Sequence, residues 1–138
     1  MTATQRKPMP PASGSAEHAA AFTTFQSLEK GVPAAWARSL ETQGLTRADI
    51  RRIIPDRTLD RRIAKGEMLK IEEADGLARL LRVVKAARDL FQNDENADTF
   101  LRSPNPALGE RIPIHMAQTD IGAREVETII GRLSHGIF

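Results

Sequence analysis

The stretch from Ile71 to Phe91 constrains the fold most, because its apolar residues recur at steps of three and four along its whole length. That spacing places them on one face of a long helix. The stripe comprises Ile71, Ala74, Leu77, Leu81, Val84 and Phe91, and it is broadened by Ala78, Leu80 and Ala87. So wide a stripe can pack on two sides, so the helix is predicted either to join two halves of the chain or to form a dimer seam.

Turn signals divide residues 22–70 into short helices with the spacing of a helix-turn-helix module. Thr46 followed by Asp49 has the spacing of a capping box, and Pro55 is a natural stop for the helix that begins there. No alternating apolar pattern is long enough to indicate a convincing strand, so the sequence predicts an all-α fold. The helices expected in this part cover 33–42, 46–54 and 57–65.

The flanking regions differ from each other in composition. Residues 1–21 are rich in Pro, Ala, Ser and Gly without an apolar period, which predicts a disordered arm. Residues 71–138 are predicted to hold the connecting helix and a second helical domain. There we expect a short helix up to Leu101, a Pro-rich loop over 103–113, a short segment over 114–117 and a final helix from near Gly122.

The sequence closes on Gly136, Ile137 and Phe138, directly after the amphipathic final helix. Chain ends are usually polar and frayed, whereas this one is an apolar hook. Such a hook either packs on its own domain or fills the groove of a partner, and the residues alone leave both alternatives open.

Basic residues gather between Leu45 and Lys70, where the net charge is +4, against −2 for the rest of the chain. A local basic excess on helices suits binding to the phosphate backbone of DNA, and an Arg-rich solvated surface is the alternative. In a helix-turn-helix the second helix enters the major groove. The candidate DNA-binding residues on that helix are Arg57, Thr58, Arg61, Arg62 and Lys65.

Little in the sequence suggests catalysis. The chain has no cysteine, which excludes disulfides and cysteine-based nucleophiles or metal sites. His18, His115 and His135 lie far apart and lack metal-ligand spacing. We therefore expect no enzymatic activity, no cofactor and no metal. No run is long and apolar enough for a membrane span, and no signal-peptide core is evident, so a cytoplasmic location is expected.

Several spaced motifs together resemble a known family. Thr58-Leu59-Asp60-Arg61-Arg62 with Gly66 is similar to a stretch of Xre-like DNA-binding domains. More specific are the following positions: Phe100-Leu101, Pro104-Asn105, Ala107-Leu108-Gly109, Pro113, Gly122, Val126, and the ending Gly131-Arg132-Leu133-Ser134-His135-Gly136-Ile137-Phe138. Over about residues 33–138 the chain resembles the ParS-like antitoxins of the Xre–MbcA–ParS group. Glu110 departs from the pattern, which has a second Gly at that position.

The resemblance implies an antitoxin with an Xre-like helix-turn-helix domain over 22–70 and a toxin-binding domain within 71–138. Its partner would be a RES-domain toxin, an NAD-consuming or ADP-ribosylating enzyme, whose active site the C-terminal domain and tail would cover. The implied toxin-binding residues are Arg132, His135, Gly136, Ile137 and Phe138. Such an antitoxin would also bind operator DNA as a repressor. Because the apolar stripe over 71–91 is wider than one small module needs to cover, we also expect at least a dimer. The alternative is a stand-alone helix-turn-helix regulator whose C-terminal domain only dimerises.

Overall fold

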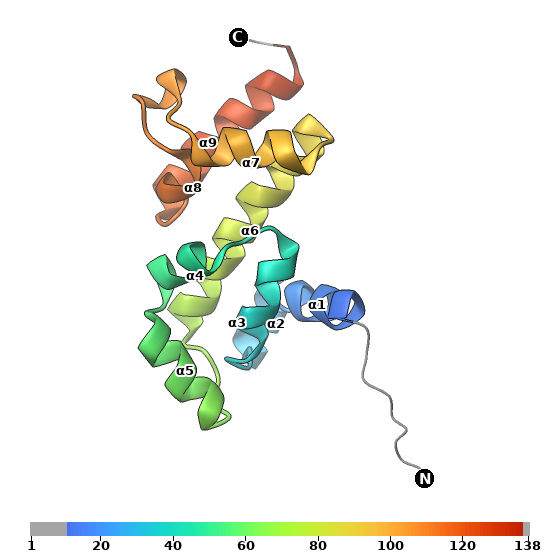
Figure 1. Cartoon of the computed structure of the whole chain (residues 1–138), viewed down its shortest axis with the longest axis vertical. Coiled ribbons are helices and arrows are strands. Elements are labelled where there is room, and N and C mark those ends of the chain that lie inside the picture. Colours follow the sequence, from blue (N-terminus) through green and yellow to red (C-terminus); the bar gives the residue numbers. More distant parts are fainter. Residues whose placement is uncertain (1–10, 137–138) are drawn as a thin grey trace.

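The chain is all-α, as its apolar periodicity predicts. A computed structural model describes the backbone of residues 11–136 and the side chains of residues 16–136. Within these residues there is no strand, and extended pairing is limited to two isolated bridges, Pro33–Met68 and Asn105–Arg111. The molecule is elongated, with an N-terminal and a C-terminal half arranged along one central helix (Figure 1).

The N-terminal half consists of short helices. They are α1 (Pro11–Ala20), α2 (Phe25–Lys30), α3 (Trp36–Ser39), the 3-10 helix η2 (Leu40–Gln43), α4 (Arg47–Ile53) and α5 (Asp56–Ala64). The central helix and the C-terminal half comprise α6 (Ile71–Phe91), α7 (Asp94–Arg102), the 3-10 helix η3 (Pro106–Leu108), α8 (Pro113–Met116) and α9 (Asp120–Ser134).

Helix α6 joins the two halves, which is the first of the two roles that its stripe allows. It packs against α2 and α4 in one half and against α7, α8 and α9 in the other (Figure 1). Leu77 and Val84 of the stripe are fully buried in the core of this chain, whereas Ile71 is 48% exposed. Most of the stripe is therefore covered by the chain itself.

The capping box predicted for α4 is present. The backbone amide of Asp49 donates to Oγ1 of Thr46 at 3.1 Å, and the amide of Thr46 donates to Oδ2 of Asp49 at 2.8 Å. The helix ends at Ile53, ahead of Pro55. The helix expected over 33–42 is shorter than predicted, since it begins at Trp36 and tightens into η2.

The expectation of a disordered arm is wrong for residues 11–20, which form α1. Contacts far along the chain hold this helix in place. The ring of His18 stacks on Trp36 with 4.6 Å between centroids, and its Nδ1 lies 2.6 Å from Oγ of Ser39. Phe22, just past the helix, is buried. The composition of this segment predicted disorder because it does not show the contacts with distant residues that hold α1 in place. Residues 1–10 of the expected arm lie outside the described residues.

The final helix begins at Asp120, earlier than the expected start near Gly122. Its N-cap is Thr119, whose Oγ1 accepts a hydrogen bond from the amide of Gly122 at 3.0 Å. The inward face carries Val126 and Ile130, which are both buried.

Candidate functional site

A groove of about 380 Å³ runs between η3 and the outer face of α9. We refer to it as the α9 groove. It is lined by Ala107, Leu108, Ile121, Arg124, Glu125, Thr128, Ile129 and Arg132.

The outer face of α9 repeats at helical spacing along this groove, from Ile121 through Glu125 and Thr128 to Arg132. Ile121 is 73% exposed, the highest value among the large apolar side chains of the chain's described part. Arg124 is held by Asp120 at 3.0 Å, whereas Arg132 makes no ion pair within residues 16–136. The groove therefore offers an uncovered apolar side chain at one end and a free guanidinium at the other.

The wall of the groove opposite α9 is a tight turn built by Asn105. Its side-chain oxygen accepts from the amide of Ala107 at 2.8 Å, and its own amide donates to the carbonyl of Arg111 at 3.0 Å. The chain can reverse there because Gly109 and Glu110 both adopt left-handed backbone conformations, with φ of 68° and 65°. This turn fixes the position of η3 beside α9.

A larger hollow of about 540 Å³ lies against α6 in the N-terminal half, but its chemistry suits a partner less well. Each basic side chain that lines it is already paired inside the chain. The pairs are Arg82–Glu127, Lys85–Asp89 and Arg88–Asp94.

The residues predicted to bind a toxin fall in two places. Arg132 lines the α9 groove, whereas His135 and Gly136 are exposed beyond the end of α9 and do not line it. The ring of His135 lies 2.8 Å from the carbonyl of Gly131 through Nδ1. Ile137 and Phe138 lie outside the described residues, so both alternatives for the hook stand.

Of the residues that line the groove, only Arg132 was predicted from the sequence to bind a partner. Ile121 carried the clearest signal, because it lies off the inward stripe of Val126 and Ile130 yet is a large apolar residue. Leu108 was noted only as part of a motif, and its place against α9 depends on the fold of the turn around Asn105.

The candidate DNA-binding residues lie on α5, after a turn of two residues that separates it from α4. Arg57, Arg61 and Lys65 are exposed, and Thr58 is half-buried. We call the three exposed cations the α5 basic face. They make no ion pair within residues 16–136, so their charge is free for a ligand.

Two other arginines near this face are engaged within the chain. Nε of Arg51 donates to Oδ2 of Asp56 at 2.8 Å, and Nε of Arg47 lies 3.7 Å from Oδ1 of the same carboxylate. The hydrogen bond from Arg51 is the main reason that the pKa of Asp56 lies below its usual value, and the charge of Arg47 adds to the effect.

Arg62 does not share this exposure, and the sequence-based interpretation of it as an exposed DNA contact is wrong. Its side chain is only 9% exposed, and its guanidinium pairs with the carboxylate of Glu73 on α6. Glu73 also accepts a hydrogen bond from the amide of Lys70 at 2.8 Å. Arg62 points toward Glu73 in the first turn of α6, so this ion pair ties α5 to α6.

Comparison with known proteins connects the α9 groove to a family. Residues 86–136, which include the groove, match the antitoxin Xre/MbcA/ParS C-terminal toxin-binding domain. Over this segment the chain is similar to the antitoxins of the Xre/MbcA/ParS group. The match is to a binding domain of proteins that are normally not enzymes, in agreement with the expectation that this chain is not an enzyme.

Three similar proteins are all named Antitoxin Xre. The one from Yersinia enterocolitica is 43% identical over 86 residues, which are 62% of this chain and 58% of that protein. The one from Photorhabdus laumondii is 36% identical over 94 residues, or 66% of this chain and 64% of that protein. The one from Pseudomonas putida is 29% identical over 121 residues, or 87% of this chain and 76% of that protein. The chain thus spans less than two thirds of the length of the first two relatives.

Neither a membrane-spanning helix nor a metal site is found among the described residues. None of their helices is long and apolar enough to cross a membrane. Residues 16–136 bring together no group of three or more His, Asp or Glu side chains that could hold a metal ion.

Proposed function

We propose that the chain is the antitoxin of a toxin–antitoxin pair and that it neutralises a RES-domain toxin through its C-terminal half. The observation that carries the proposal is the α9 groove, with its exposed Ile121 and unpaired Arg132, inside the segment that matches a toxin-binding domain. The shared name of the three relatives supports the antitoxin role.

The chemistry of the groove suggests what the toxin supplies. A large apolar side chain that is mostly exposed gains free energy when a partner covers it, and such anchors dominate buried interfaces. A planar guanidinium binds carboxylates with two parallel hydrogen bonds. We therefore expect the toxin to present an apolar pocket for Ile121 and a carboxylate for Arg132. In the same proposal His135 and the tail over 136–138 extend the contact into the toxin's active-site cleft.

The test is co-expression with the product of the neighbouring gene, followed by co-purification and an assay of NAD consumption. Ile121→Asp and Arg132→Glu should each weaken the complex and restore toxin activity, while their melting temperatures stay near that of the wild type. Lys85→Glu is the matched control, because Lys85 is 79% exposed on α6, away from the groove. Variants that bind and inhibit the toxin as well as the control does would exclude the α9 groove as the binding surface.

A second activity, repression of its own operon, is supported by the α5 basic face. Arg57, Arg61 and Lys65 give a helix of a helix-turn-helix pair three free cations that can contact phosphates or base edges. Arg57→Ala and Arg61→Ala should each weaken binding to the DNA upstream of the gene. When the logarithm of the DNA-binding constant is plotted against the logarithm of the salt concentration, removal of one phosphate-binding side chain should also make the slope shallower by about 0.9. Lys85→Ala serves as the control. Unchanged affinity and slope would remove this face from the DNA interface.

These two activities separate the proposal from the alternative of a stand-alone regulator. A regulator of that kind would bind the upstream DNA with the same affinity but would not co-purify with a RES-domain toxin. The antitoxin should do both.

The proposal includes self-association into at least a dimer. The N-terminal half leaves three large apolar side chains uncovered, namely Phe25 at 70%, Met68 at 55% and Ile71 at 48% exposure. Light scattering at tens of micromolar should give at least twice the chain mass of 15.2 kDa. A mass of one chain would reject the dimer.

A further inference from the structure

Three arginines from α3 and α4 converge on Asp56, the first residue of α5. Nε of Arg51 donates to Oδ2 at 2.8 Å, while Nε of Arg47 lies 3.7 Å and Nη1 of Arg38 lies 4.0 Å from Oδ1. Arg47 and Arg51 stand about one turn apart on α4, so they share a face of that helix. We call these two residues the α4 arginine pair.

The α4 arginine pair meets Asp56 side-on. A guanidinium carries N–H donors on Nε and on both Nη atoms. The contacts with Asp56 run through Nε, and within residues 16–136 neither Nη1 nor Nη2 of Arg47 or Arg51 donates a hydrogen bond. Both side chains remain about half exposed. Each arginine is therefore held in place while its two Nη groups can still bind an anion.

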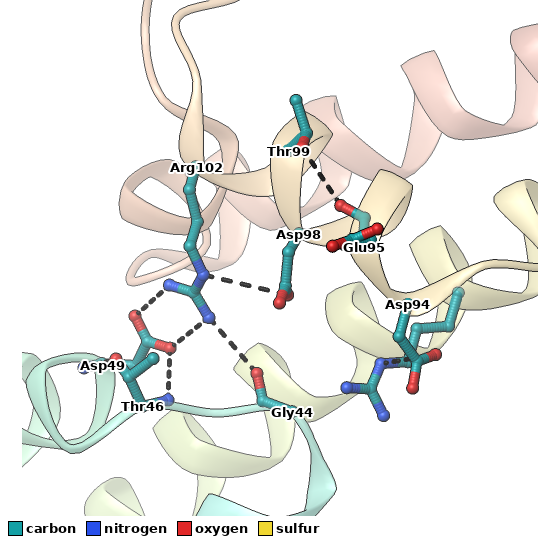
Figure 2. Close-up of polar contacts among 9 residues, drawn as sticks. Gly44, Thr46, Asp49, Asp94, Glu95, Asp98, Thr99 and Arg102 are labelled. Atoms are coloured by element: carbon teal, nitrogen blue, oxygen red, sulfur yellow. Dashed lines mark hydrogen bonds and ion pairs between the residues drawn. The ribbon is translucent and has the colours of Figure 1, made fainter.

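Arg102, at the end of α7, shows the opposite arrangement (Figure 2). Its Nη1 and Nη2 donate to Oδ1 and Oδ2 of Asp49, both at 2.9 Å, and Nη2 also donates to the carbonyl of Gly44 at 3.3 Å. Both Nη groups are used inside the chain, as in an arginine that stabilises the contact between two helices. By this comparison the side-on geometry of the α4 arginine pair suits a ligand outside the chain.

The α4 arginine pair lies at the start of the α5 basic face, because Asp56 directly precedes Arg57, the first cation of that face. In a helix-turn-helix the second helix enters the major groove while the first helix crosses the DNA backbone. Arginines of α4 that are held at the start of α5 would then face the phosphates beside the groove. A guanidinium binds a phosphate group with two parallel hydrogen bonds.

We propose that Asp56 is a positioning residue for DNA binding, which holds Arg47 and Arg51 so that their Nη groups contact the DNA backbone. An arginine that is already held loses less side-chain freedom on binding, so its contact with a phosphate contributes more affinity. The negative charge of Asp56 opposes this effect weakly, because the two guanidinium groups lie closer to the phosphates than the carboxylate does. The inference rests on the proposed repression of the operon, because it needs α5 to bind DNA.

The experiment measures the dissociation constant of the full chain and its variants for the DNA upstream of the gene, at several salt concentrations. Loss of an acidic residue near DNA ordinarily strengthens binding, because it removes repulsion from the phosphates. We expect the reverse for Asp56→Ala. Its dissociation constant should rise about threefold or more, out of the roughly tenfold that one charge-assisted hydrogen bond contributes.

Asp60→Ala is the matched control. Asp60 lies one turn further along α5 and pairs with Arg38 at 2.5 Å. Within residues 16–136 it makes no ion pair with the α4 arginine pair. Asp60→Ala therefore removes the same charge from the same helix without releasing those arginines, and it should bind the DNA as tightly as the wild type or more tightly. Equal affinities of Asp56→Ala and Asp60→Ala would overturn the inference.

A combination of variants tests whether Asp56 acts through an arginine. Arg51→Gln should weaken binding by about tenfold and make the salt dependence of the binding constant shallower by about 0.9 in logarithmic slope. Asp56→Ala should then weaken the Arg51→Gln protein by a smaller factor than it weakens the wild type. A merely structural role predicts the same factor in both backgrounds together with a lower melting temperature, and that result would also overturn the inference.

Two further outcomes have a defined reading. If Asp56→Ala does not fold, Asp56→Asn replaces it, because an amide keeps polar atoms at the start of α5 while the charge between the arginines is lost. Wild-type protein that does not bind the upstream DNA overturns the proposed repression instead.

Discussion

Gly122 of α9 lies so close to the backbone carbonyl of Met116 in α8 that a β-carbon on Gly122 would stand 2.0 Å from that oxygen. Residue 122 is buried, and its amide is bonded to the N-cap Thr119, so the backbone has no room to retreat. The glycine at this position therefore has a steric cause. It allows α8 and α9 to approach and sets the start of the helix that carries the groove.

Gly122→Ala should destabilise the fold by about 3 kcal/mol or more, at the upper end of the cost of overpacking, because the obstacle is backbone. Urea unfolding followed by circular dichroism measures this change. Gly131→Ala is the matched control, since it lies in the same helix with nothing within 4 Å of its β-carbon. It should be neutral or stabilising by up to about 1 kcal/mol. Equal stability of the two variants would refute the steric account.

Glu110 has a φ of 65°, which lies in the left-handed region that favours glycine. A left-handed conformation costs a residue with a β-carbon about 1–2 kcal/mol. Glu110→Gly should therefore stabilise the chain by up to about 1 kcal/mol, once the greater freedom of glycine in the unfolded chain is subtracted. Gly109→Ala, at φ 68° in the same turn, should have the opposite sign. Thermal unfolding of both variants checks the prediction, and a loss of stability in Glu110→Gly would contradict it.

The stability of the fold should depend on the ionisation of Asp49 in acid. Its pKa is lower in the folded chain than its usual value of 3.8, so the folded state binds this proton less readily than the unfolded state. The stabilisation is therefore fully present above about pH 4 and is lost as the pH falls through the folded-state pKa. Asp49→Asn should be less stable at neutral pH and should lose less stability on acidification. Free energies of unfolding between pH 2 and pH 7, about the range of this titration, test it, with exposed Asp89→Asn as control. Parallel curves for wild type and Asp49→Asn would contradict the prediction.

Local rules in the sequence predicted the elements that depend on neighbours along the chain. Thr46 and Asp49 form the capping box expected from their spacing, and the stripe of α6 identified its bounds, Ile71 and Phe91. These features need only hydrogen bonds and apolar faces within one helix, so the sequence contains them.

The features that the sequence did not reveal depend on distant contacts. Helix α1 is held by the stack of His18 on Trp36, eighteen positions apart by their numbers. Arg62 is buried because it pairs with Glu73 of α6. Helical periodicity within α5 alone does not reveal whether another helix will cover an arginine next to an inward-facing residue. The α9 groove likewise exists only once the turn at Asn105 brings η3 beside Ile121.

Arg61 and Arg62 are neighbours in sequence but should differ in what their loss does. Arg62→Ala removes the partner of Glu73, whose side chain is 15% exposed, and should cost about 3 kcal/mol or more, because an unpaired carboxylate remains largely buried. Arg61→Ala removes an exposed side chain and should change stability by less than about 0.5 kcal/mol while weakening DNA binding. Urea unfolding and DNA titration of the two single variants separate these effects. The single variants are needed because a protein that carries both substitutions would lose stability and DNA affinity together. An Arg62→Ala protein that is as stable as the wild type but binds DNA more weakly would show that Arg62 belongs to the DNA-binding face.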